Sequence, residues 1–526
     1  MKFNGISKII LFTTLSMLLG SAGARSESSD WGPYYNKGTE SFKQKQYSSA
    51  LKSFEKALSL IDEKDSEASD RASLYNDLGL VYDQLEMHKR AREYFQKSLK
   101  IKEGLKDNQS TVSTLNNMAS SYLKEDETDR AIEYLLKAND LIEKDSGKDA
   151  AALSVNLNRL AGIYKKENKL SKAEAALRQS LAIAKKEFGS KHPAVSVIQN
   201  NLAVVLRMQD KQEEANELYK ESLEIREKAL GETDLSVAAS LNNLARSYRE
   251  QEQYEKALPL LKRSLEIVRK SKEAKPEDLV TAIKNLALNL RENEESGEAV
   301  PLYEEALEIL KKNALESDES LADTYIDLSA AYQELEDYEK AKTSLENALL
   351  VCDKNKEETQ NLRVRVLSKL EEVYSQMDDF KAAISLNDKQ RDFIKQEVKP
   401  DVDLLARKYN EVGLLYKRDG QTDKAEEEFL KGLKLLEEKY GKDSIESALF
   451  INNLARLYDV TGKSEQAAKL YERLIEIRTS AYGRKSLPVA AALQHYAVVL
   501  IKLNKPEEAK KYREEAEKLE LSLDNE

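Results

Sequence analysis

Pairs of adjacent asparagines recur along the chain, and an amide side chain can both donate and accept hydrogen bonds. The phrase LNNLA at residues 241–245 returns as INNLA at residues 451–455. Other paired or single members are Asn116/Asn117, Asn200/Asn201, Asn158, Asn285 and Asn410. Such a row could clamp the backbone of an extended peptide, or it could bond neighbouring helices and hold them together. Both interpretations stay open, and we expect any ligand contact to come from Asn201, Asn243 and Asn285.

A second set of polar residues is basic and equally spaced. Its members follow one another at intervals of 42 residues: Lys165, Arg207, Arg249 and Arg291. Three more cations stand at related positions: Arg246, Lys417 and Arg456. Because a guanidinium pairs bidentately with carboxylates, this row is expected to attract acidic peptide segments or a C-terminal carboxylate. A solvated helix face is the alternative, since Glu250 and Glu292 stand directly beside two of the arginines.

Residues for catalysis or metal binding show no comparable pattern. His88, His192 and His495 lie in different segments and share no metal-ligand spacing. No phosphate-binding glycine loop, nucleophile elbow or dinucleotide-binding fingerprint occurs in a strand–turn–helix context. We therefore expect a protein without enzymatic activity, cofactor or metal.

The asparagine and basic residues fall on a repeat that runs along the chain. Taking the small residue that ends LNNLA as an anchor, the spacings are 41, 40 and then 42 residues nine times. The anchors are Gly38, Gly79, Ala119, Ala161, Ala203, Ala245, Ala287, Ser329, Glu371, Gly413, Ala455 and Ala497. Twelve residues after each anchor stands an alanine, in all twelve repeats.

Each repeat reads as two amphipathic helices joined by a short polar turn. In the sixth repeat we expect helices over residues 235–250 and 254–269. Small residues recur because two helices approach closely only where side chains are short. Pro259 and Pro301 are expected in the first turn of their helices, where a missing N–H does least harm. Repeat nine departs most, with Glu371 at its anchor, and we expect its stacking interface to be the weakest.

This columnar pattern resembles the tetratricopeptide repeat. The 42-residue period, the LNNLA phrase and the joint KHPAVSVIQNNLA at residues 191–203 are similar to the longer subtype found in kinesin light chains and many bacterial repeat proteins. The resemblance implies an all-α fold, an α-solenoid of about twelve antiparallel helix pairs that forms a right-handed superhelix. It also implies that the first helix of each repeat lines a concave groove. The candidate peptide- or protein-binding residues are therefore Asn201, Asn243, Asn285, Lys165, Arg207, Arg246, Arg249 and Arg291.

Charge and cysteine content narrow the class of partner. The net charge of −11 argues against non-specific binding to nucleic acid and against attraction to an anionic membrane surface. The one cysteine, Cys352, excludes an internal disulfide framework.

The first 24 residues predict a secretory signal peptide. Lys2 and Lys8 precede an apolar run at residues 9–20, and Ala22-Gly23-Ala24 provides a cleavage site. The run is too short to span a bilayer, which takes ~20 residues. We therefore expect residues 1–24 to be removed, residues 31–519 to form the repeat solenoid and residues 520–526 to form a polar tail. The mature protein is expected to be exported, to the periplasm or outside the cell, and not to span a membrane.

These features predict an exported, non-enzymatic scaffold that binds proteins or peptides through a groove. The alternative is a structural component, in which the repeats assemble an envelope complex or a homo-oligomer.

Overall fold

The computed structural model describes residues 29–61, 67–145, 150–313, 318–354, 359–395 and 400–523. The predicted signal peptide, residues 1–24, lies outside the described residues. The chain divides into two compact units, the first ending at Asn289 and the second beginning at Leu290, and each is described by itself.

Helices joined by short turns make up the described residues, and these residues contain no strand. The first unit holds α2 (Gly32–Lys43), α3 (Tyr47–Leu58), α4 (Ala68–Gln84), α5 (His88–Leu105), α6 (Asn108–Lys124), α7 (Thr128–Lys144), α8 (Ala150–Lys166), α9 (Leu170–Phe188), α10 (Pro193–Arg207), α11 (Gln212–Leu230), α12 (Leu235–Arg249), α13 (Tyr254–Lys270) and most of α14 (Pro276–Glu292). The second unit holds α15 (Ser296–Lys312), α16 (Asp318–Glu334), α17 (Tyr338–Lys354), α18 (Gln360–Gln376), α19 (Phe380–Lys395), α20 (Val402–Arg418), α21 (Thr422–Tyr440), the 3₁₀ helix η2 (Ile445–Ser447), α22 (Ala448–Val460), α23 (Ser464–Tyr482), α24 (Leu487–Lys502) and α25 (Pro506–Leu523).

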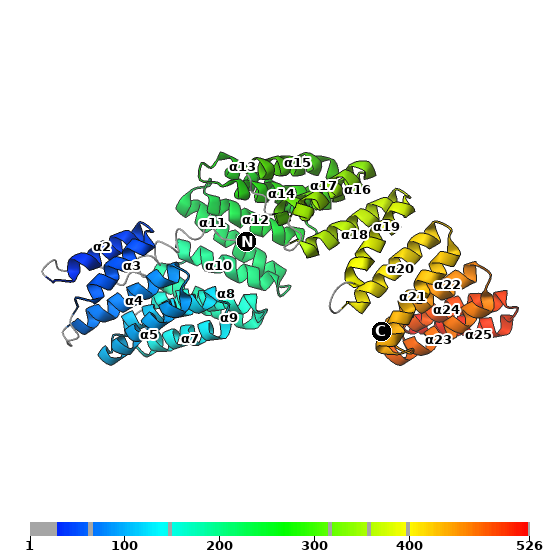
Figure 1. The fold of residues 1–526 in the computed structure, drawn as a ribbon, viewed down its shortest axis with the longest axis horizontal. Coiled ribbons are helices and arrows are strands. Elements are labelled where there is room, and N and C mark those ends of the chain that lie inside the picture. The colour runs from blue at the N-terminus through cyan, green and yellow to red at the C-terminus, as the bar shows by residue number, and fades with distance from the viewer. Residues whose placement is uncertain are drawn as a thin grey trace. The chain divides into compact units, whose positions relative to one another are not determined.

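Within each unit the helices stack as pairs in chain order (Figure 1). The even-numbered helix is the first of its repeat and the odd-numbered helix is the second. The two helices expected in the sixth repeat are confirmed as α12 and α13, with ends that agree within one residue. The twenty-four α-helices of the described residues confirm the predicted all-α solenoid. Helix α25 continues four residues into the predicted polar tail.

One small-to-large contact recurs inside the repeats. The twelve alanines that follow the anchors by twelve residues are all buried, with at most 2% exposure. In the three repeats whose anchor is glycine, the phenylalanine sixteen residues after the anchor packs on the anchor itself. A Cβ added to Gly79 would lie 2.5 Å from Phe95, and one added to Gly413 would lie 2.5 Å from Phe429. The anchor must therefore be small, because the facing ring already occupies the space that a side chain needs.

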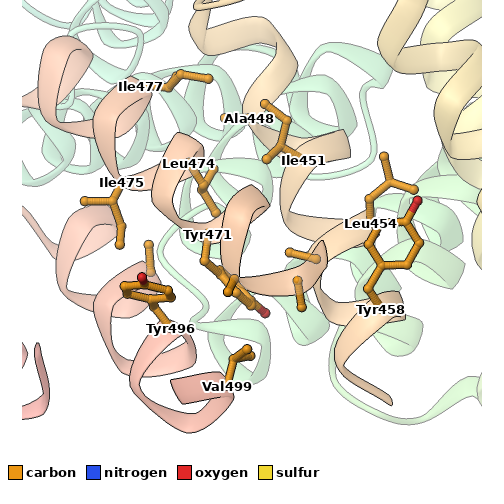
Figure 2. Close-up of a cluster of buried hydrophobic side chains, with 14 of the residues drawn as sticks. Ala448, Ile451, Leu454, Tyr458, Tyr471, Leu474, Ile475, Ile477, Tyr496 and Val499 are labelled. Atoms are coloured by element: carbon orange, nitrogen blue, oxygen red, sulfur yellow. The ribbon is translucent and has the colours of Figure 1, made fainter. Parts of the chain in front are cut away.

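The apolar side chains of successive helices merge into continuous clusters. In the second unit, Figure 2 shows residues of α22, α23 and α24 gathered together, among them Ile451, Tyr471 and Tyr496. Each repeat therefore buries its apolar surface against the next one, as expected of a solenoid.

The turn inside each repeat has one conformation throughout. Seven residues after every anchor the backbone has a positive φ, at Gly420, at Gly462 and at ten residues that are not glycine. The turn also closes the preceding helix, since Lys211 N donates to Leu206 O at 3.0 Å and Gln253 N donates to Tyr248 O at 2.9 Å. This pattern caps the last carbonyls of the first helix and turns the chain back.

The expected position of two prolines is wrong. Helix α13 begins at Tyr254 and α15 begins at Ser296, so Pro259 and Pro301 are the sixth residues of their helices rather than members of the first turn. Each proline gives up one backbone hydrogen bond, near the start of the helix, to the carbonyl four residues earlier.

Candidate functional site

The predicted site residues lie on the first helices of their repeats. Lys165 is on α8, Asn201 and Arg207 are on α10, and three more are on α12: Asn243, Arg246 and Arg249. Asn285 and Arg291 are on α14, on opposite sides of the boundary between the two units.

The second asparagine of a pair reaches back to the preceding repeat. Asn243 Nδ2 donates to Asn200 Oδ1 at 2.8 Å, and Asn201 Nδ2 donates to Asn158 Oδ1 at 2.9 Å. The same bond joins Asn117 to Asn76 at 3.0 Å in the first unit and Asn453 to Asn410 at 2.7 Å in the second. One amide N–H of each pair therefore serves the stack, which is the second of the two interpretations made from the sequence.

The asparagines retain hydrogen-bonding capacity beyond this ladder. Asn201 and Asn243 are half-buried, and each amide has a second N–H and an oxygen in addition to the bond described. Asn285 is also half-buried, but the ladder does not extend to it, because the buried Asn242 Oδ1 has no partner among the described residues. A ligand contact by these three residues stays a prediction.

Arg207 is paired with an acid of the following repeat. Its guanidinium bonds to the carboxylate of Glu250, which also accepts from Arg246 Nε at 3.0 Å. Burial works to lower the pKa of Arg207, but the hydrogen bond with Glu250 raises it above its usual value overall. Burial likewise works to raise the pKa of Glu250, and the two arginines hold it below its usual value. The positive charge of Arg207 is therefore largely neutralised by Glu250 of the next repeat.

The Arg207–Glu250 pair follows a rule of the repeat. The residue four places after one anchor meets the residue five places after the next anchor. In the second unit, Arg291 Nε lies 3.4 Å from Glu334 Oε1 in the same relation. With the charges exchanged, Lys124 Nζ lies 2.6 Å from Asp83 Oδ2. The sequence reasoning missed this pairing, although the acid five residues after the next anchor was the signal that could have found it.

In the first unit, this rule leaves the predicted cation Lys165 without an acid. Met208, which is exposed, stands at the position that Glu250 has relative to Arg207. Among the described residues Lys165 forms no ion pair, and burial together with the neighbouring charge of Arg207 lowers its pKa. Arg249 is half-buried. In the described part of the first unit, Lys165 is therefore an ammonium group without a carboxylate partner next to the Arg207–Glu250 pair.

A polar network replaces the usual core contact of repeat nine. Glu371 and Asn387 occupy the positions of Gly413 and Phe429 in the next repeat, and Asn387 Nδ2 donates to Glu371 Oε1 at 3.0 Å. Lys408 Nζ lies 3.5 Å from Glu371 Oε2 and donates to Glu411 Oε2 at 2.7 Å. Glu371 and Lys408 are both buried, and burial raises the pKa of Glu371.

Three members of this network, Glu371, Lys408 and Glu411, line a cleft between α18 and α20. The cleft has a volume of about 620 Å³ and is lined by Ser368, Glu371, Glu372, Ser375, Lys408, Glu411, Leu414, Leu415, Lys417 and Arg418. Sequence reasoning did not single out Lys408. The position five residues before the anchor holds apolar or small polar residues in the other repeats, and a lysine is normally solvated.

Two further observations concern metal binding and membrane spanning. In the part of the chain that the structure describes, no group of three or more His, Cys, Asp or Glu residues is placed to hold a metal ion. None of the described helices combines the length and the apolar composition that crossing a bilayer requires.

Comparison with known proteins agrees with the geometry. The family model described as "Tetratricopeptide repeat" matches residues 34–104, 110–186, 157–228, 231–312, 320–389, 404–480 and 452–519. No curated protein matches the chain.

Several solved structures are similar to parts of the chain. BtubC (BKLC) from P. vanneervenii is 21% identical, with 48% of this chain and 94% of that chain covered and a TM-score of 0.38. The nearly identical TPR-like repeats of a putative kinesin light chain from Podosopora anserina are 27% identical, with coverages of 40% and 99% and a TM-score of 0.36. The apo form of RapI is 17% identical, with coverages of 70% and 98% and a TM-score of 0.46.

Proposed function

This chain belongs to the tetratricopeptide repeat family, and from that premise we propose that it is an exported, non-enzymatic scaffold that binds acidic segments of a partner protein. Scaffolds of this family are suited to protein–protein interaction, because their stacked helices present long surfaces built from many repeats. The acidic character of the partner and the export of the chain are the specific parts of the proposal.

The uncompensated Lys165 is the observation that carries the acidic preference. It lies on a first helix beside Arg207, and Met208 leaves it without the carboxylate that its neighbours have. An acidic side chain of a partner would supply that carboxylate. Another acceptor of the same segment would take the second amide N–H of Asn201, which lies on the same helix as Arg207.

The test of this site adds the missing acid. Fluorescein-labelled glutamate-rich and lysine-rich peptides are titrated with the wild-type chain and with Met208→Glu, and binding is followed by fluorescence anisotropy. We expect the glutamate-rich peptide to bind the wild type more tightly, and Met208→Glu to weaken it about tenfold, or ~1.4 kcal/mol. Met87→Glu, at another exposed methionine, is the matched control and should leave binding unchanged. Equal binding of the two peptides to the wild type, or equal affinity of the wild type and Met208→Glu for the glutamate-rich peptide, would contradict the proposal.

Export is tested separately from binding. Mass spectrometry of the protein recovered from cell fractions and from the medium should find a mature chain that begins at Arg25, outside the cytoplasm. A chain that keeps residues 1–24 in the cytoplasmic fraction would disprove export and leave the binding proposal intact.

A further inference from the structure

Another surface, in the second unit, combines exposed apolar side chains with cations that have no ion pair among the described residues. It is formed by three successive first helices, and we call it the C-terminal patch: Leu414 and Lys417 of α20, Arg456 and Val460 of α22, and Val498 and Ile501 of α24. Its four apolar side chains are between 40% and 67% exposed. Single exposed apolar residues are ordinary on a protein surface, whereas several gathered on one face mark an interaction site.

The register of the repeat places these residues on one face. Lys502 Nζ lies 2.6 Å from Asp459 Oδ1, which brings the last turns of α22 and α24 together. Val460 stands four residues after Arg456 and therefore on the same side of α22. Val498 stands three residues before Ile501 and therefore on the same side of α24.

The third helix joins the same face through its cation. Lys417 is close enough to Arg456 for the arginine's charge to act on it, and burial together with that charge lowers the pKa of Lys417. Leu414 precedes Lys417 by three residues on α20, again one turn along the same side of the helix.

The cations of the patch lack the acids that other repeats provide. Val460 stands five residues after its anchor, where Glu250 pairs with Arg207 and Glu334 pairs with Arg291 in their repeats. Within the described ranges neither Lys417 nor Arg456 forms an ion pair with a carboxylate. The nearby Asp459 is already bound to Lys502. His495 adds no charge to the patch at neutral pH, because burial and the charges of Arg456 and Arg478 lower its pKa below its usual value.

We propose that the C-terminal patch docks a segment of another protein that carries apolar side chains alternating with carboxylates. The apolar part would cover Leu414, Val460, Val498 and Ile501, and the carboxylates would neutralise Lys417 and Arg456. This inference rests on the proposed scaffold function and assigns it a second site, with an apolar requirement that the Lys165 site does not have.

The experiment uses three short labelled peptides as probes for the full chain. One alternates leucine with glutamate, one alternates serine with glutamate, and one alternates leucine with lysine. Fluorescence anisotropy should show the leucine–glutamate peptide binding most tightly. The double variant Lys417→Glu/Arg456→Glu should weaken it at least about tenfold. Val460→Glu, which gives Lys417 an acid and removes an apolar contact, should weaken it as well.

Matched controls separate the patch from the general charge of the protein. Lys434→Glu reverses one charge at an exposed site of α21, which is half the charge change of the double variant, and Leu430→Glu makes the same kind of apolar-to-acidic change as Val460→Glu on that helix. Both controls should bind like the wild type, and circular dichroism should show unchanged helix content in every variant.

Two results would overturn the inference. One is an affinity for the leucine–glutamate peptide that the double variant and Val460→Glu leave unchanged. The other is equally tight binding of the leucine–lysine peptide. If Met208→Glu weakens binding while the patch variants do not, the patch proposal fails and the scaffold proposal stands. If no glutamate-containing peptide binds the wild type, both fail.

Discussion

Asn243 Nδ2 donates a hydrogen bond of 2.8 Å to Oδ1 of Asn200, which stands 43 residues earlier in the chain. Asn200 is buried on α10 and Asn243 is half-buried on α12, so the bond joins two successive repeats. In the pair Asn200/Asn201, the first asparagine accepts from the repeat that follows, and the second donates to the repeat that precedes. The recurring LNNLA phrase therefore encodes a polar ladder as well as an apolar core.

Removal of one amide from this ladder should destabilise the first unit. In Asn243→Ala the buried Asn200 Oδ1 loses its partner, and we expect a loss of about 1–2 kcal/mol in the free energy of unfolding. Urea denaturation followed by circular dichroism measures the change. Asn285→Ala is the matched control, since no ladder bond is seen at Asn285 within the described residues, and it should cost less. Equal losses in the two variants would show that the ladder bond is not the cause.

Two glycine substitutions should have opposite effects on stability. In Gly79→Ala the added Cβ meets the Phe95 ring at 2.5 Å, and overpacking of this kind costs roughly 1–3 kcal/mol. In Gly162→Ala nothing lies within 4 Å of the added Cβ, and alanine favours a helix by about 0.5–1 kcal/mol over glycine. Thermal unfolding should therefore shift downward for the first variant and upward for the second. A shift in the same direction for both would contradict the steric argument.

The polar pair of repeat nine should be replaceable as a pair. Glu371→Gly removes the acceptor of the Asn387 amide, and Asn387→Phe alone places a ring against the Glu371 side chain. The double variant recreates the Gly413/Phe429 arrangement of the next repeat. We expect each single change to cost about 1–3 kcal/mol and the double variant to recover at least about 1 kcal/mol relative to their sum. Strict additivity in this double-mutant cycle would show that the two departures are independent.

Lys102 should make stability depend on pH in the alkaline range. Its ammonium is buried and donates to Thr114 Oγ at 2.7 Å, and burial lowers its pKa from 10.5 to about 8. Between these values the unfolded chain binds the proton and the native chain does not, so the Lys102 contribution to stability rises with pH across this window. The full difference is up to about 3 kcal/mol.

The measurement compares the wild type with Lys102→Met by urea denaturation at several pH values. The variant should be most favoured, relative to the wild type, below about pH 8, and this relative advantage should shrink toward pH 10.5. Lys100→Met, at an exposed position of the same helix, isolates the effect of burial. A difference between wild type and Lys102→Met that stays constant with pH would contradict the prediction.

The helix packing could be predicted from the sequence because the same packing contacts recur in every repeat of the chain. The buried alanine twelve residues after each anchor and the alternation of first and second helices depend only on spacings within one repeat. The sequence of a single repeat is therefore enough to predict them. The ladder from Asn243 to Asn200 was left open, because the same amide geometry serves a ligand or a neighbouring helix equally well.

The charge balance of the site required the structure. Glu250 was visible beside Arg249 in the sequence, but its partner is Arg207 of the preceding repeat. Lys408 was overlooked for a related reason, since its buried ammonium lies against Glu371 of the preceding repeat. Ion-pair partners in neighbouring repeats depend on how far one first helix is shifted along the next. The sequence of a single repeat does not contain that information.

Neutralising Glu250 should strengthen the binding of acidic peptides. In Glu250→Gln the guanidinium groups of Arg207 and Arg246 lose the carboxylate that occupies them, and both become available to a ligand. We expect the glutamate-rich peptide to bind about threefold to tenfold more tightly, the opposite direction to Met208→Glu. Stability should fall by about 1 kcal/mol, because the side chain of Arg207 is only 11% exposed and loses its partner. Glu217→Gln, which removes an exposed acid of α11, is the matched control and should change neither quantity. Weaker binding in Glu250→Gln would mean that Glu250 itself contributes to the ligand site, and that Arg207 and Arg246 do not bind the acidic groups of the peptide.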